Sequence, residues 1–208
     1  MADKVLPRHS HIEVVIQQAV NLVGEFEKAN EISLTPLSSN HWAAQTWEAP
    51  PLGVCKINSD VACFRDASTG LGCVVRDHVG DVLLSTCWRS REEYDVDIGE
   101  ALAARHSLSI SLEAGFRKVI LETDNLKLLQ HVKHRKTQCT SFGLIVKDIL
   151  YLADSCVFFY VSQVGRMGNG VAHRLAKASI MYDVMRVWME EVPECAADAV
   201  LQDILSLS

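Results

Sequence analysis

The sequence predicts an α/β domain whose five-stranded mixed sheet begins with an antiparallel three-strand meander and is flanked by helices. Two observations predict this fold class. Residues 54–88 contain three short runs of strand-favouring residues separated by turn-forming residues. From about residue 98 the hydrophobic period becomes helical, and helical and extended segments then alternate as far as residue 180. The resulting order, βββαβααβα, predicts helices on both faces of the sheet.

The meander is predicted from three extended segments with short connections. These strands are expected over 54–62, 70–76 and 81–88. The residues Asp77, His78, Val79 and Gly80 separate the second strand from the third and are typical of a hairpin turn. Strands joined by such short turns pair antiparallel, so we expect the three to lie side by side.

The later elements are predicted from the spacing of their apolar residues. We expect helices over 98–114, 125–132, 142–152 and 169–180, and strands over 118–123 and 157–164. Gly115 follows the first of these helices, and glycine is a common residue just beyond a helix C-terminus. Asn169 precedes the last helix and is interpreted as its N-cap.

The predicted domain, residues 47–180, has a segment on either side. Residues 1–46 are expected to form an N-terminal helix over about 11–29 followed by a linker rich in proline and serine. The helix is predicted from apolar residues at helical spacing, namely Ile12, Val15, Ile16, Ala19, Leu22, Val23 and Phe26. Residues 181–208 form a C-terminal tail in which we expect a further short helix.

Composition excludes several classes of protein. Of the 208 residues 49% are hydrophobic, which argues against global disorder, but no apolar run is long enough to span a bilayer. The first residues lack a basic stretch followed by an apolar one, so we expect no secretory signal. The seven cysteines are irregularly spaced without a Cys-x-x-Cys pair, so we expect an intracellular reducing compartment, nuclear or cytoplasmic. The net charge of −6 argues against tight, sequence-independent binding of nucleic acid.

Three carboxylates lie at the boundaries of predicted elements. Asp60 lies on the first strand, Glu100 in the first turn of the first core helix, and Asp124 directly after the fourth strand. If the first and fourth strands are neighbours, all three meet at one end of the sheet. Converging carboxylates repel unless a cation neutralises them, and hard oxygen ligands select Mg²⁺ or Mn²⁺. The predicted chemistry is metal-dependent hydrolysis of a phosphodiester.

Each carboxylate also has a simpler interpretation. Asp124 alone is better explained as an N-cap of the helix that begins at Asn125. Glu100 alone is better explained as a favourable charge near a helix N-terminus. Asp60 is harder to explain structurally, because a carboxylate within an apolar strand is costly unless it is paired. The combination of the three favours a metal site.

Six motifs identify a family resemblance. They occur in order over about two thirds of the chain: WEAPP from Trp47, KINSDVA, GLGCVVRDHVGDVL, GEALAARHSL, GFRKVILETDN and RMGNGVAHRLAKAS. With these motifs the chain resembles the ribonuclease H-like proteins abundant in plants, which are related to the ribonuclease H modules of retrotransposon reverse transcriptases. The resemblance implies the ribonuclease H fold and an endonuclease that hydrolyses the RNA strand of RNA–DNA hybrids.

The resemblance also implies roles for individual residues. Asp60, Glu100 and Asp124 stand at the positions of catalytic carboxylates that hold Mg²⁺ or Mn²⁺. His173, four residues after Asn169, stands where the family usually has a fourth acidic residue. A neutral imidazole is a poorer ligand for Mg²⁺ than a carboxylate, so we expect weakened catalysis. Two alternatives stay open: an inactive nucleic-acid-binding module, or a protein-interaction module on the same fold.

Expected contacts with nucleic acid come from two places. Arg166, in the loop before the last helix, is placed to contact a phosphate, and Asn169 lies beside it. Lys133, Arg135 and Lys136 form a short basic run that is either a solvated loop or a reduced form of the basic protrusion with which some ribonucleases H grip the hybrid. The predicted partner is therefore an RNA–DNA hybrid; protein partners are unknown and no membrane is expected.

Overall fold

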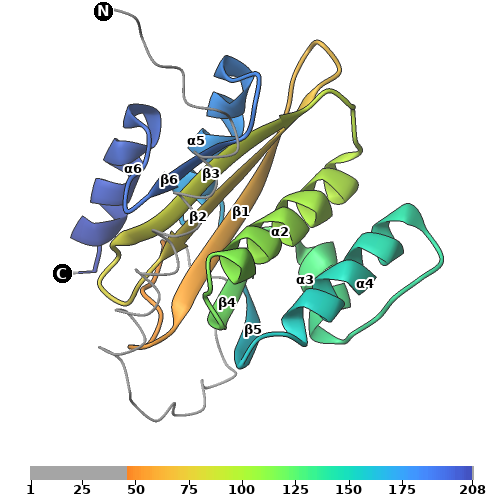
Figure 1. Cartoon of the computed structure of the whole chain (residues 1–208), viewed down its shortest axis with the longest axis horizontal. Helices are drawn as coiled ribbons and strands as arrows, with labels where there is room; N and C mark the ends of the chain where they lie inside the picture. The colour runs from red at the N-terminus through yellow and green to blue at the C-terminus, as the bar shows by residue number, and fades with distance from the viewer. Residues whose placement is uncertain (1–45, 208) are drawn as a thin grey trace, which may run out of the picture.

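The computed structural model describes residues 46–207, and these form a mixed sheet with helices on both faces (Figure 1). The strand order is β5-β4-β1-β2-β3-β6. The predicted meander is confirmed, because β2 pairs antiparallel with both β1 and β3, while β4 is parallel to β1 and to β5. These strands are β1 (Cys55–Cys63), β2 (Thr69–Arg76), β3 (Val82–Ser90), β4 (Lys118–Thr123) and β5 (Phe158–Gln163). The predicted helix over 11–29 and the linker after it lie outside the described residues.

The prediction of five strands is wrong, because the sheet has a sixth. Strand β6 (Arg186–Met189) pairs antiparallel with β3 at the edge opposite β5. It is only four residues long, which is too short to produce a clear alternation of apolar and polar residues. The tail therefore contributes a strand to the sheet as well as the predicted C-terminal helix.

The helices form two layers on opposite faces of the sheet (Figure 1). Their bounds are α2 (Val96–Glu113), α3 (Leu126–Lys133), α4 (Ser141–Ala153), α5 (Gly170–Ala178) and α6 (Glu194–Leu205), with a 3₁₀ turn over Ser179–Met181. Helices α2, α3 and α4 share one hydrophobic core with the sheet, and α5 and α6 share the other. The alternation along β2 accounts for both cores, since Cys73 and Val75 face the first and Val74 the second. In the described part of the chain, no helix is long and apolar enough to cross a membrane.

Glycine on β2 lets α5 approach the sheet closely. A Cβ atom built on Gly72 would overlap backbone atoms of Ala172 and Ala176. Gly72 is the partner of Asp60 across the β1–β2 pair. The missing side chain therefore allows the start of α5, with His173, to lie over Asp60.

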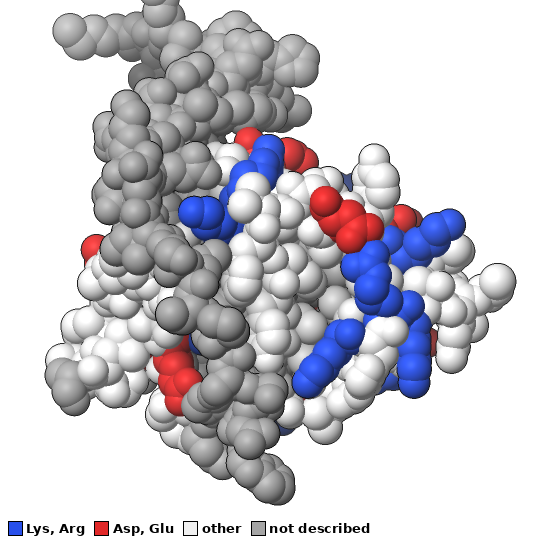
Figure 2. Space-filling view, turned by 90° about the horizontal axis from the view of Figure 1, so that it is seen from below, with Lys and Arg blue, Asp and Glu red and all other residues white. Residues whose placement is uncertain are grey.

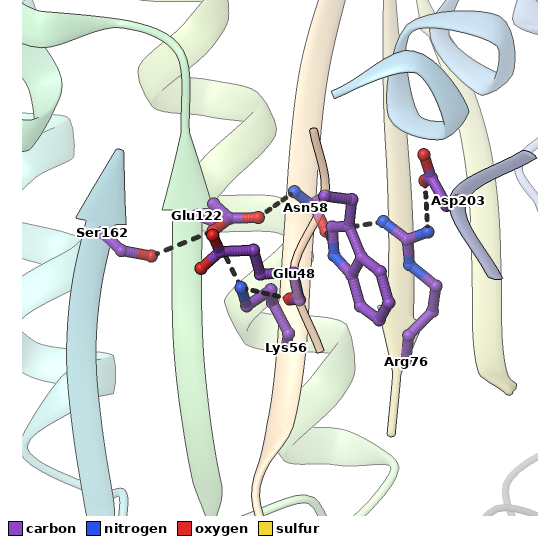
Figure 3. Close-up of polar contacts among 8 residues, drawn as sticks. Glu48, Lys56, Asn58, Arg76, Glu122, Ser162 and Asp203 are labelled. Atoms are coloured by element: carbon purple, nitrogen blue, oxygen red, sulfur yellow. Dashed lines mark hydrogen bonds and ion pairs between the residues drawn. The ribbon is translucent and has the colours of Figure 1, made fainter. Parts of the chain in front are cut away.

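Buried polar side chains of β1, β2 and β4, namely Lys56, Asn58, Arg76 and Glu122, form a layer on the sheet (Figure 3). The Lys56 ammonium lies 3.0 Å from Glu122 Oε1, and Asn58 Nδ2 donates to Glu122 Oε2 at 2.9 Å. Ser162 on β5 donates to Glu122 Oε1 at 3.3 Å. Buried charges are costly unless they are paired in this way. Because Glu122 on β4 is bonded to residues of both β1 and β5, these contacts hold β4 between its two neighbours.

The same layer attaches both flanking segments to the sheet (Figure 3). The Arg76 guanidinium, fully buried on β2, donates to Asp203 of α6 at 2.6 Å and to Asn58 Oδ1 at 3.1 Å. Its carbon Cζ lies 3.8 Å from the centre of the Trp47 ring, and Trp47 Nε1 donates to Asn58 Oδ1 at 3.1 Å. Residues before β1 and the C-terminal helix are thus held by one arginine.

Candidate metal site

Asp60, Glu100 and Asp124 converge at one end of the sheet. One carboxylate oxygen from each lies within 4.8 Å of the others. The register explains part of this convergence: Asn58 on β1 is the partner of Glu122 on β4, so the residues two further along, Asp60 and Asp124, come side by side. Glu100 reaches them from α2, which crosses the other face of the sheet.

The environment of Glu100 and Asp60 opposes their ionisation. Burial, followed by the charges of Asp60 and Asp124, raises the pKa of Glu100 to about 9. Burial also raises the pKa of Asp60 to about 6, although the hydrogen bond and charge of His173 act in the opposite direction. Glu100 Oε2 is buried without a hydrogen-bond partner. A divalent cation would provide a partner for this oxygen and would neutralise the repulsion among the carboxylates. These residues therefore fit a Mg²⁺ or Mn²⁺ ion.

His173 lies at the edge of this cluster. Its Nδ1 is 2.6 Å from Asp60 Oδ2, and its side chain is 48% exposed. The residue therefore occupies the fourth position beside the three carboxylates, where the sequence placed it. Its imidazole engages an oxygen that is also available to a metal ion.

Asn169 fastens the start of α5 to β1. It occupies the N-cap position, as expected, but its side chain makes no capping hydrogen bond, so the interpretation of its side chain as a cap is wrong. Instead Nδ2 donates to the backbone oxygen of Ser59 at 2.9 Å. This bond holds α5 against the strand residue that precedes Asp60, and so helps to place His173.

The simpler interpretations of Asp124 and Glu100 do not hold. The N-cap of α3 is Asn125, whose side chain accepts a hydrogen bond from Leu128 N at 2.8 Å, so Asp124 is not the cap. Helix α2 begins at Val96 rather than near residue 98, which places Glu100 beyond the first turn, so that part of the prediction is wrong. The acidic residue in the first turn is Asp97.

The carboxylates open into a cavity of about 390 Å³. Its lining comes from β1, α2, the end of β4 and the start of α5: Asp60, Val61, Cys63, Val96, Glu100, Asp124, Arg166, Asn169 and His173. The charge of the exposed Arg166 acts to lower the pKa of Glu100, so this guanidinium lies close enough to influence the cluster. The cavity therefore combines metal-ligating oxygens with a cation for an incoming phosphate.

The other predicted contacts lie outside this cavity. Lys133, Arg135 and Lys136 are exposed at the C-terminal end of α3 and in the turn that follows it. Arg135 is paired with Asp154 through two contacts of 2.9 Å. The structure thus brings Arg166 and Asn169 to the carboxylates and leaves the basic run outside the cavity.

Sequence reasoning missed four residues around the cavity. Val61, Cys63 and Val96 contribute to its lining, and Asp97 links the helix of Glu100 to the segment that carries Asp124. A helical spacing of three residues between Asp97 and Glu100 was the available signal for the last of these. Nothing in the sequence singles out Cys63 or Val96.

The comparison with known families agrees with this geometry. The sequence model of the family described as reverse transcriptase-like matches residues 58–179, which is more than half of the chain. That match begins two residues before Asp60 and includes Glu100, Asp124 and His173. No curated protein matches the chain in sequence.

Several solved structures share the fold. An RNase H1 from the halophilic archaeon Halobacterium salinarum has a TM-score of 0.57 at 15% identity, covering 62% of this chain and 98% of its own. An RNase H domain from Mycobacterium tuberculosis has a TM-score of 0.56 at 18% identity, covering 62% and 94%. LC11-RNase H1, isolated from compost and solved with an RNA/DNA hybrid, has a TM-score of 0.55 at 16% identity, covering 61% and 96%. At these identities the similarity is one of fold, and it confirms the predicted ribonuclease H-like architecture.

Proposed function

The chain belongs to the reverse transcriptase-like family, and we propose that it is a divalent-metal-dependent endoribonuclease that hydrolyses the RNA strand of RNA–DNA hybrids. The observation that carries the proposal is the convergence of Asp60, Glu100 and Asp124 within 4.8 Å in a cavity. Solved structures of the same fold include RNases H, one of them in complex with an RNA/DNA hybrid.

The three carboxylates would hold Mg²⁺ or Mn²⁺. When bound, such an ion supplies Lewis-acid stabilisation of the phosphate and lowers the pKa of a coordinated water. Other side chains position the substrate and the site: Arg166 binds a phosphate at the mouth of the cavity, and Asn169 holds α5 in place through its bond to Ser59. His173 keeps Asp60 Oδ2 in a hydrogen bond of 2.6 Å.

That hydrogen bond is the reason to expect weak activity. An imidazole on Asp60 competes for an oxygen that the ion needs, and it contributes no negative charge of its own. His173→Asp should therefore raise the rate of cleavage in Mg²⁺. An unchanged or lower rate in this variant would contradict the idea that His173 limits catalysis.

A duplex bound at the cavity would extend toward α3. Helix α3 has eight residues and is therefore about 12 Å long, which corresponds to roughly three or four phosphates of one strand. In the view from below, Lys and Arg side chains gather on the side of the molecule formed by α3 and α4 (Figure 2). We assign Lys133, Arg135 and Lys136 to phosphate contacts there, with recognition through minor-groove shape and 2′-hydroxyls.

Cleavage of a labelled RNA–DNA hybrid tests the proposal. Wild type is compared with Asp60→Asn in Mg²⁺ and in Mn²⁺, with Asp198→Asn, an exposed residue of α6, as the matched control. We expect wild type and the control to cleave the RNA strand and Asp60→Asn to be inactive. Equal cleavage by wild type and Asp60→Asn would refute the assignment of the site.

One observation favours a second candidate function. Because His173 already engages Asp60, the domain is also suited to bind a hybrid without turning it over. This alternative predicts hybrid binding by wild type with no cleavage in either metal. Failure to bind any duplex would instead favour the protein-interaction module.

A further inference from the structure

Glu100 lies on α2 and Asp124 in the short connection between β4 and α3, and one side chain connects α2 to that connection. Asp97, in the first turn of α2, accepts a hydrogen bond from Asn125 Nδ2 at 3.0 Å through Oδ1. Its other oxygen, Oδ2, lies 2.7 Å from the Lys127 ammonium. Asn125 directly follows Asp124, and Asp97 precedes Glu100 by three residues, so this link joins the immediate surroundings of two ligands.

The Asn125 side chain is held at both ends. Its Oδ1 accepts from Leu128 N at 2.8 Å and caps α3, which leaves Nδ2 to point at Asp97. Its backbone N–H donates to Thr123 Oγ1 at 3.1 Å. The amide is therefore fixed in orientation by α3 itself, and Asp97 binds to a rigid group rather than to a mobile side chain.

This link opposes the repulsion within the cluster. Glu100 and Asp124 must both be ionised to hold a cation, and two ionised carboxylates within 4.8 Å repel each other, which favours separation of α2 from the segment of Asp124. Among the described residues 46–207, Asp97 is the residue of α2 whose side chain bonds to the segment 124–133, and it does so through two hydrogen bonds. The Asp97 carboxylate is thus placed to keep α2 and the segment of Asp124 together.

We propose that Asp97 is a positioning residue that holds Glu100 and Asp124 at the separation a divalent ion requires. The proposal rests on the metal site of the proposed function and adds a residue that touches neither ion nor substrate. Partners that hydrogen-bond a metal ligand directly typically change metal affinity by about 10- to 100-fold when removed, and Asp97, which acts through Asn125, should fall at the lower end of that range. Asp97 is only partly buried, so its contribution should appear in metal binding rather than in folding.

Binding of Mn²⁺ to the full chain, measured by titration calorimetry without nucleic acid, tests the proposal. Asp97→Ala should weaken binding by about 10-fold, the lower end of that range. The matched control is Asp148→Ala, which removes another exposed ion pair of α2, the one between Asp148 and Arg105 at 3.0 Å. This control should bind Mn²⁺ as wild type does, and the two alanine variants should have similar melting temperatures.

Two further variants separate position from charge. Asp97→Asn removes the negative charge but keeps an oxygen that can accept from Asn125, so it should retain most of the affinity. If the effect were one of charge alone, Asp97→Asn would be as weak as Asp97→Ala. Lys127→Met keeps the Asn125 link and should lose little affinity, whereas a charge effect would increase it.

The outcomes also distinguish this inference from the proposed function. If Asp60→Asn abolishes Mn²⁺ binding while Asp97→Ala binds normally, the positioning role is refuted and the metal site stands. If wild type and Asp60→Asn bind Mn²⁺ equally, the metal site itself is refuted, and the role of Asp97 with it.

Discussion

Replacing Glu100 with glutamine should stabilise the metal-free protein at neutral pH. The pKa of Glu100 is raised from its ordinary value of 4.5 to about 9 by burial and by the neighbouring carboxylates. In the unfolded chain the residue is ionised above about pH 4.5, while the folded chain keeps it protonated up to about pH 9. Stability contributed by this group is therefore complete at low pH and is lost as the pH rises through that window.

The size of the effect follows from linkage. One proton difference between folded and unfolded states changes the free energy of unfolding by about 1.4 kcal/mol per pH unit. Between about pH 5.5 and pH 7.5 the wild-type protein should lose about 3 kcal/mol relative to Glu100→Gln, since glutamine does not titrate. Glu100 is only 6% exposed, so solvent screening reduces this figure little.

Urea unfolding followed by circular dichroism, in the presence of a chelator, measures this difference. Both proteins are compared at several pH values, with Glu113→Gln, an exposed glutamate on the same helix, as the matched control. The gap between wild type and Glu100→Gln should widen as pH rises, while the control follows wild type. A constant gap would refute the electrostatic account of the site. Added Mg²⁺ should stabilise wild type more than Glu100→Gln, because only wild type offers all three ligands.

Two further predictions concern how the flanking elements hold the site. Asp203→Ala leaves the fully buried Arg76 guanidinium without its carboxylate and should destabilise the fold by about 3–5 kcal/mol, whereas Asp198→Ala on the same helix should have little effect in urea unfolding. Gly72→Ala forces a Cβ into the backbone of α5 and should lower the free energy of unfolding by about 1–3 kcal/mol. Gly170→Ala, where nothing lies within 4 Å of the added Cβ, should be tolerated. Equal melting temperatures for the two variants would contradict this packing argument.

The fold was predictable wherever local patterns repeat. The meander has three strands of eight or nine residues with short turns, and strands β4 and β5 have clear apolar runs. Strand β6 escaped prediction because four residues carry too little periodicity, and its place at the edge depends on pairing with β3. The fold class is thus predictable from local sequence patterns, whereas the sixth strand forms through long-range pairing that those patterns do not reveal.

The site was predictable as a set of residues but not as a geometry. Element boundaries and motif order identified Asp60, Glu100 and Asp124 in the sequence. The topology of the fold then brings β1, the start of α2 and the end of β4 together, and the three carboxylates with them. The bond between Asp60 and His173 joins residues 113 apart in sequence. Such pairings depend on side-chain orientation after packing, which no periodicity encodes.

The energetics of the site bear on which function the chain retains. A buried carboxylate with an unsatisfied oxygen and a pKa of about 9 destabilises the folded protein at neutral pH, and glutamine would remove that cost. A domain that served only as a scaffold for protein contacts would gain stability by losing the Glu100 carboxylate, whose Oε2 has no hydrogen-bond partner. The chain instead has three carboxylates within 4.8 Å, and Asp97 is hydrogen-bonded to the residue that follows Asp124. A carboxylate that is costly when unliganded is explained by a ligand that neutralises it, and this supports the proposed metal site over a protein-interaction module.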